Sequence, residues 1–197
     1  MTTSKVSFFK RHALSIILGL GLLTYILVAG TTGSCKACSA ITGTLGIPSL
    51  ASSAATIDPA MRPDAPNWQL RDLQGNAVSS TEFAGKVVMV DFWATWCPPC
   101  RRMIPGMVEL QAQYQDQGLA IIGISLDQAG PEVVRAFNEE FGVNYTSLMG
   151  DEAVVNAFGG VEGIPTSFLI DREGRIVNKH VGYVSKRQLE AEIKSLL

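Results

Sequence analysis

The stretch that decides the fold is VVMVDFWATWCPPC, residues 87–100. Its first seven residues form an apolar run, broken by Asp91, that predicts a strand buried on both faces. Cys97 and Cys100 follow where helical periodicity begins, so the two thiols lie one turn apart at a helix N-terminus. Unpaired backbone N–H groups at that end favour an anion, and such a position lowers the pKa of a cysteine. Because the thiolate is the nucleophile of disulfide exchange, the stretch predicts a site that makes and breaks disulfides.

Strands and helices are predicted to alternate on both sides of this stretch. Before it, Gln74-Gly75-Asn76 predicts the turn of a β-hairpin, and the spacing of Ser79 and Glu82 is that of a capping box. The elements predicted after it are a helix over 97–117 ended by Gly118, a strand over 119–126, a helix from Pro131 with Val133, Val134, Phe137 and Phe141 inward, a strand over 146–149, a short helix over 151–158, a hairpin of 167–170 with 176–181, and a last helix capped by Ser185. This alternation indicates a three-layer α/β domain.

Length, charge and cysteine usage narrow the class of protein. The chain has 197 residues and a net charge of −2, which suggests one domain with an appendage. So weak a charge gives no electrostatic reason to expect nucleic acid as a partner. All four cysteines fall in C-x-x-C pairs, Cys35/Cys38 and Cys97/Cys100. Two such pairs are also typical of zinc sites, but an apparent linker lies between them, which argues against a compact four-thiolate site.

The N-terminal part of the sequence is interpreted as a membrane anchor. Residues 1–12 are basic and residues 13–30 carry no charge. As a helix the second segment would span roughly 27 Å, close to the roughly 30 Å of the hydrocarbon core. The positive-inside rule places residues 1–12 in the cytoplasm and everything after Gly30 outside. A cleaved signal peptide is the alternative, but the length favours an uncleaved anchor, and both interpretations export the rest of the chain.

Residues 31–62 are interpreted as a juxtamembrane segment that carries Cys35 and Cys38, followed by a linker. The linker is rich in Ser, Ala, Thr, Gly and Pro and nearly free of charge, so it is predicted to be flexible, with a reach of roughly 25–30 Å. For the cysteine pair we consider, in order of preference, a local disulfide or two idle thiols, an electron relay to the second pair, and metal capture. Residues 63–197 then form the globular domain.

Three motifs in the globular part resemble one known superfamily. The segment 90–101 is similar to the active-site segment of thioredoxins, Gly163-Ile164-Pro165-Thr166 to their cis-proline segment, and Pro105 to the kink proline of their first long helix. Over about residues 64–197 the chain most resembles the membrane-anchored TlpA/ResA-like thiol-disulfide oxidoreductases of bacteria. The resemblance implies a thioredoxin fold, a central mixed sheet flanked by helices, with an N-terminal β-hairpin and a preceding transmembrane helix.

The site residues follow from position and from this resemblance. Cys97, at the helix start, is expected to be the attacking thiol, and Cys100, one turn further in, to resolve the mixed disulfide. A structural disulfide is the alternative, which Trp96 and the cis-proline motif disfavour. The resemblance implies that the Ile164 backbone pairs with substrate backbone like an added strand, beside a cis bond to Pro165. We therefore assign Trp96, expected to pack around the site, together with Ile164 and Pro165 to substrate binding.

Asp91 is the third catalytic candidate. A carboxylate inside an apolar strand is unfavourable unless it is neutral or paired, so its pKa is expected to be raised. That suits proton transfer with Cys100 near neutral pH. Thioredoxins carry Asp at this position, whereas many TlpA/ResA-like proteins carry Asn here and Glu three residues after the second cysteine, where this chain has Met103. A structural Asp91 bonded to backbone is the alternative.

Together these features predict an extracytoplasmic protein-disulfide reductase held in the bacterial inner membrane by a single span, with its catalytic domain in the periplasm. The thiols carry the electrons, so no cofactor and no metal are expected. Because the outer compartment is oxidising, a transmembrane thiol donor is required, and the resemblance also implies one. Its family clients are exported disulfide proteins of cytochrome c or copper-site maturation. The alternatives are a thiol peroxidase and a non-enzymatic copper-binding assembly factor that uses Cys97 and Cys100; an oxidase direction also stays open.

Overall fold

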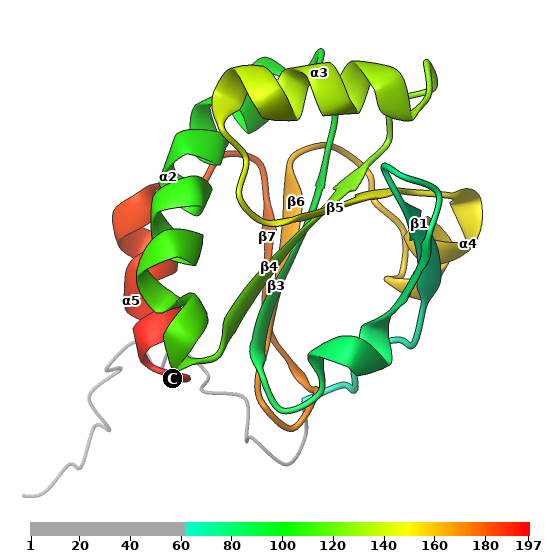
Figure 1. The fold of residues 1–197 in the computed structure, drawn as a ribbon. Coiled ribbons are helices and arrows are strands. Elements are labelled where there is room, and N and C mark those ends of the chain that lie inside the picture. The colour runs from blue at the N-terminus through cyan, green and yellow to red at the C-terminus, as the bar shows by residue number, and fades with distance from the viewer. Residues whose placement is uncertain (1–61) are drawn as a thin grey trace, which may run out of the picture. The chain divides into compact units, whose positions relative to one another are not determined.

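The computed structural model describes residues 62–197, in which a seven-stranded sheet carries helices on both faces (Figure 1). The elements in chain order are β1 (Gln69–Asp72), β2 (Ala77–Ser79), η2 (Ser80–Phe83), β3 (Val87–Trp93), α2 (Pro98–Tyr114), η3 (Gln115–Gln117), β4 (Leu119–Ser125), α3 (Pro131–Phe141), β5 (Thr146–Met149), α4 (Glu152–Ala157), β6 (Thr166–Ile170), β7 (Ile176–Val181) and α5 (Lys186–Lys194). None of the helices in this part of the chain is long and apolar enough to cross a bilayer. The anchor expected over 13–30, the basic segment 1–12 and the pair Cys35/Cys38 lie outside the described residues.

The sheet is mixed, and β3 lies at its centre. The strand order is β2-β1-β5-β4-β3-β6-β7. Strands β3, β4 and β5 run parallel, whereas β6 pairs antiparallel with β3, and the hairpins β1–β2 and β6–β7 form the two edges. All seven residues of β3 are buried, which explains why its sequence is a continuous apolar run rather than an alternating one. The predicted thioredoxin-like α/β fold with its N-terminal hairpin is confirmed.

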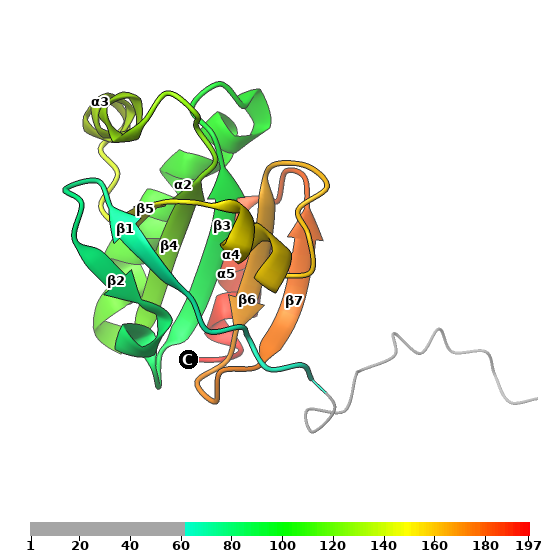
Figure 2. The same ribbon diagram turned by 90° about the vertical axis from the view of Figure 1, so that its right-hand side faces the viewer.

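Alternation along β3 divides the core into two halves. Met89 and Trp93 pack with side chains of α2, α3 and α5, whereas Val90 and Phe92 pack with side chains of α4 and of the β1–β2 region. Figure 2 shows α4 on one side of the sheet and α2 and α5 on the other. Asp91, in register between Met89 and Trp93, therefore points toward the face that α2 covers.

Helix α2 begins where the sequence predicts. Cys97 is its N-cap, Pro98 stands at the first position, and Pro105 lies inside the helix. Its buried stripe contains Met103, Met107, Leu110 and Tyr114, which recur at helical spacing on one face. The short turn η3 continues it, and Gly118 ends it in the left-handed region at φ 99°.

One residue predicted to face the core, Val133, faces solvent instead. Val133 of α3 is 38% exposed, whereas Val134 and Phe137 are buried. Phe141 stacks on Phe137 with ring centroids 4.1 Å apart. Residues 134, 137 and 141 share one side of a helix, and Val133 lies about 100° away from Val134, which turns it toward solvent.

The described part of the chain enters the domain at the β6–β7 turn. The amide of Ala65 donates to the Gly174 carbonyl and the amide of Ile176 donates to the Pro63 carbonyl, both at 2.8 Å. Because β6 runs antiparallel to β3, this turn lies at the end of the sheet opposite to the one where β3 leads into Cys97. The entry point and the cysteine pair are therefore at opposite ends of the domain.

Candidate active site

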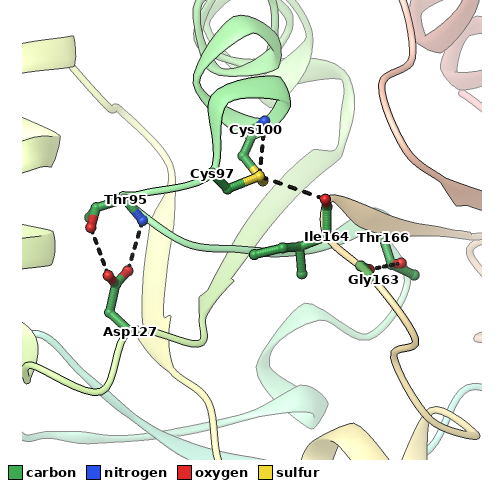
Figure 3. The surroundings of a disulfide bond; sticks show 7 residues. All are labelled: Thr95, Cys97, Cys100, Asp127, Gly163, Ile164 and Thr166. Carbon is green, nitrogen blue, oxygen red and sulfur yellow. Dashed lines mark hydrogen bonds between the residues drawn. A yellow bond between two sulfur atoms is a disulfide. The ribbon is translucent and has the colours of Figure 1, made fainter.

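Cys97 and Cys100 form a disulfide at the start of α2 (Figure 3). The amide N–H of Cys100 donates to the Cys97 sulfur at 3.3 Å, so a backbone donor is already aimed at the atom that would carry charge as a thiolate. Cys97 keeps 2% of its surface exposed and Cys100 none. The arrangement gives one sulfur at the helix N-cap and a second one turn inside, which is the geometry that the spacing predicts.

The segment before β6 lies against the sulfur of Cys97. The Ile164–Pro165 peptide bond is cis, as the resemblance implies. The Ile164 carbonyl oxygen lies 3.7 Å from the Cys97 sulfur (Figure 3). The Thr166 hydroxyl donates to the Gly163 carbonyl at 2.6 Å and closes the turn. The structure therefore brings a backbone carbonyl beside the expected nucleophile.

Exposed aromatic side chains adjoin the disulfide. Trp96, next to Cys97, is 66% exposed and so does not pack into the domain, whereas Trp93 is buried. Tyr183 is 51% exposed, and the guanidinium of Arg102 lies 5.0 Å from its ring centroid. The Gly182 amide donates to the Pro165 carbonyl, so the loop that carries Tyr183 adjoins the cis-proline segment. Tyr183 was not predicted, because its sequence position after a strand gives no sign that it lies beside Arg102 of α2.

Asp91 is fully buried in the middle of β3. Within residues 62–197 neither of its oxygens has a hydrogen-bond partner, so the alternative of a backbone-bonded structural aspartate does not match this arrangement. Burial raises the pKa of Asp91 to about 8, because removal from water disfavours the charged form. Met103, which occupies the position of the acid in many TlpA/ResA-like proteins, is buried and apolar. The expected rise in the pKa is confirmed.

A residue that the sequence reasoning missed, Asp127, holds the loop between β3 and α2. Its carboxylate accepts a hydrogen bond from the Thr95 amide at 2.9 Å and one from the Thr95 hydroxyl at 2.6 Å (Figure 3). The hydroxyl of Ser125, at the end of β4, donates to the same carboxylate at 2.8 Å. Since parallel strands end at the same edge of a sheet, an acid two residues after β4 could have been placed beside the cysteines from topology.

Within residues 62–197 no metal site is found beside the disulfide, and the second cysteine pair is not described. No group of three His, Cys, Asp or Glu side chains that could bind a metal ion occurs in the described part of the domain. His180, on the edge strand β7, lies 2.8 Å from the Glu192 carboxylate. Cys35 and Cys38 fall in the part of the chain that is not described.

In comparisons of sequence and of structure, this chain is similar to proteins of thiol-disulfide exchange. The model of the AhpC/TSA family matches residues 61–179. The thiol-disulfide oxidoreductase ResA of Bacillus thuringiensis strain Al Hakam is 34% identical over 133 residues, which cover 68% of this chain and 76% of the relative. ResA of Geobacillus thermodenitrificans is 36% identical over 134 residues, covering 67% and 75%. The crystal structure of a thioredoxin-family thiol:disulfide interchange protein from Chlorobium tepidum is 34% identical, with a TM-score of 0.65, and the match covers 71% of this chain and 99% of that one.

Proposed function

The chain belongs to the ResA-like thiol-disulfide oxidoreductases of the AhpC/TSA family, and from this premise we propose that it reduces disulfides of exported proteins. The observation that carries the proposal is the Cys97–Cys100 disulfide at the start of α2, with the Ile164 carbonyl beside it. One sulfur at a helix N-cap and one inside is an arrangement suited to attack by the first and resolution by the second.

In the proposed reaction the Cys97 thiolate attacks one sulfur of a client disulfide. A Cys97–client bond forms, the client S–S bond breaks, and the other client sulfur leaves as a thiolate. The Cys100 thiol then loses its proton to ionised Asp91 and attacks the Cys97 sulfur. The Cys97–client bond breaks, the second client thiolate leaves, and the two electrons of the dithiol have moved to the client.

The proposed role of Asp91 matches its pKa of about 8, which lies near the pH at which the enzyme would operate. The ionised fraction takes the proton of Cys100 during resolution. The protonated form returns a proton to the leaving Cys100 sulfur when a donor reduces the disulfide again. One buried group can thus serve both half-reactions.

The proposed client is an extended peptide segment. The half-buried Ile164 offers its backbone beside the Cys97 sulfur, and an added strand would pair there. The exposed ring of Trp96 lies next to the same sulfur in the chain, and the ring of Tyr183 adjoins Pro165 through its loop. Such surfaces favour binding of unfolded or loop segments over folded faces.

The proposed location is the bacterial inner membrane, with residues 1–12 in the cytoplasm, a span over 13–30, residues 31–62 as a linker and 63–197 as the periplasmic domain. The basic flank and the uncharged apolar stretch support it. A transmembrane thiol donor would supply the electrons, since the periplasm is oxidising. Clients of cytochrome c or copper-site maturation fit this location.

The direction of the reaction is tested by the reduction potential of the full-length chain, equilibrated with dithiol buffers in detergent. We expect a value near that of thioredoxin, about −270 mV, because a reductase needs a poorly oxidising disulfide. A value near about −120 mV would reverse the proposed direction. In the same preparation, rapid oxidation by hydrogen peroxide would favour a thiol peroxidase, and stoichiometric copper on the reduced protein would favour an assembly factor.

The pair Cys35/Cys38 is expected to be accessory. In membranes that contain the physiological donor, the double variant Cys35→Ser/Cys38→Ser should regain its Cys97–Cys100 dithiol at the wild-type rate, because the domain carries its own resolving cysteine. Alkylation of thiols at timed intervals measures this rate. A large loss, with Cys35–Cys97 or Cys38–Cys97 cross-links in single cysteine variants, would make the chain a two-stage electron carrier.

A further inference from the structure

Several buried polar atoms without partners among residues 62–197 belong to Asp91 and to residues on β3 and on or beside its neighbouring strands. The Asp91 carboxyl oxygens, the indole nitrogen of Trp93 and the hydroxyls of Tyr145 and Ser167 are all buried, and none has a hydrogen-bond partner among the described residues. All four residues are at least nine-tenths buried. Since buried polar groups in native proteins are nearly always paired, this concentration of one acid and three possible donors calls for a shared role.

Strand register places these groups near one another. Asp91 pairs with Gly123 on β4 and with Ser167 on β6. A Cβ atom at Gly123 would lie 3.0 Å from the indole nitrogen of Trp93 and 3.2 Å from Cε2 of Tyr145. The missing side chain at position 123 therefore lets the indole and the phenol close over β4, directly beside the strand position of Asp91.

Among residues 62–197 no cation serves as the partner of Asp91. None of the ion pairs in the described part of the chain includes it. The titratable groups on the elements that pack against this side of β3 include Tyr145 before β5 and the two cysteines of α2. Tyr114 of α2 and His180 of β7, the register partner of Ser167, are also titratable, but each already has a partner on α5, Glu190 and Glu192 respectively. Gly123 of β4, Ser167 of β6 and Met103 of α2 are neutral. Of the nearby arginines, Arg101 lies over the rings of α3, and Arg135 donates to the Leu73 carbonyl. Neutral donors are thus the groups available to an ionised Asp91.

Tyr145 responds to the charge of Asp91. Burial is the main cause that raises the pKa of the Tyr145 phenol, and the negative charge of Asp91 raises it further. The phenol therefore keeps its proton and remains a donor at every pH at which the enzyme would work.

We propose that Tyr145 is a positioning residue for the redox reaction, whose hydroxyl, with the Trp93 indole N–H and the Ser167 hydroxyl, forms the donor site for the ionised Asp91 carboxylate, directly or through one bound water. The inference rests on the proposed role of Asp91 as the proton acceptor from Cys100. No proton leaves Tyr145: the proton of Cys100 stays on Asp91, and the three donors stabilise the charged form before the transfer. The donor site thereby sets the pH at which Asp91 becomes an effective base.

Tyr145→Phe in the full-length chain tests this directly. Loss of a donor to the charged form disfavours ionisation, so the midpoint of the Asp91 carboxyl titration should rise by about one pH unit. The ¹³C chemical shift of the Asp91 side chain, followed against pH in the oxidised protein in detergent micelles, measures it without any need for activity. The pH profile of mixed-disulfide resolution should move upward equally, with a rate at pH 7 about tenfold lower.

Tyr114→Phe is the matched control. Tyr114 belongs to the same core, but its hydroxyl donates to Glu190 at 2.6 Å, so its removal should leave both midpoints unchanged. Ser167→Ala removes another proposed donor and should also raise the midpoint of the Asp91 titration. This variant still tests the donor site if Tyr145→Phe does not fold. Unchanged Asp91 midpoints in both variants would overturn the donor site.

The Asp91→Asn variant distinguishes the proposed catalytic role of Asp91 from the proposed donor site. If it slows resolution while Tyr145→Phe moves neither midpoint, the catalytic role stands and the donor site is wrong. If it leaves resolution unchanged while the NMR midpoint still moves in Tyr145→Phe, the donor site stands and the proposed role of Asp91 is wrong.

Discussion

Cys97→Ser is expected to abolish the reduction of protein disulfides, with a loss of at least about a thousandfold, because a serine hydroxyl cannot replace the thiolate that attacks the client. Cys100→Ser should instead keep the attack and stop at the mixed disulfide, since the resolving thiol is gone. Cys97→Ser should therefore form no adduct with its clients, whereas Cys100→Ser should remain covalently bound to them.

Non-reducing gels and mass spectrometry of adducts distinguish the two outcomes. Cys100→Ser should carry client proteins bonded through Cys97, and the adducts should disappear with dithiothreitol. The double variant Cys35→Ser/Cys38→Ser provides the control for the loss of thiols elsewhere, and it should retain full turnover. Adducts bonded through Cys100, or an active Cys97→Ser protein, would show that the roles are reversed.

Asp91→Asn is expected to change the pH dependence of both stability and rate. A carboxyl whose pKa is about 8 when folded and 3.8 ordinarily keeps its proton in the folded state while the unfolded chain has released it. The contribution of Asp91 to the wild-type free energy of unfolding therefore falls as pH rises between these two values, by about 1.4 kcal/mol per pH unit, and levels off above the higher one. The amide does not titrate, so the variant should gain stability relative to wild type by a few kcal/mol between pH 4 and pH 8.

Urea unfolding of the oxidised protein at several pH values measures this gain, and Asp116→Asn, at an exposed position on η3, is the control that should follow wild type. Asp91→Asn should also resolve mixed disulfides about a hundredfold more slowly than wild type near pH 8, because the general base is missing. Stopped-flow measurements give that rate. Parallel stability curves for wild type and Asp91→Asn would contradict the raised pKa, and equal rates would leave the residue without a catalytic role.

Local patterns in the sequence are sufficient to predict the helices and strands and the pairing of Cys97 with Cys100. The apolar run of β3 and the spacing of Cys97 and Cys100 are contained within fourteen consecutive residues, so short-range rules identify them. The cis bond before Pro165 came from a four-residue resemblance. What these patterns do not contain is the strand order that joins distant segments.

The surroundings of the site depend on that order. Asp127 reaches Thr95 because β4 runs parallel to β3. The Tyr145 ring lies beside the strand position of Asp91 because Gly123, the register partner of Asp91 on β4, has no side chain. Each contact needs a register that no single segment specifies. Trp96, in the loop that leads from β3 into α2, is exposed, and its expected place around the site and in substrate binding stays a prediction.

The entry of the chain at the β6–β7 turn has a mechanical consequence for a tethered enzyme. The seven residues of β3 separate that turn from the cysteine end by about 23 Å. On the proposed topology the tether joins the domain at the end away from Cys97, and we expect client proteins to reach the cysteines without displacing it. Re-reduction by the proposed donor in the membrane would require the domain to turn its Cys97 end toward the lipid. On the proposed topology the length of the linker therefore governs how often the Cys97–Cys100 disulfide is reduced again. The chemistry at Cys97 governs how fast clients oxidise the dithiol.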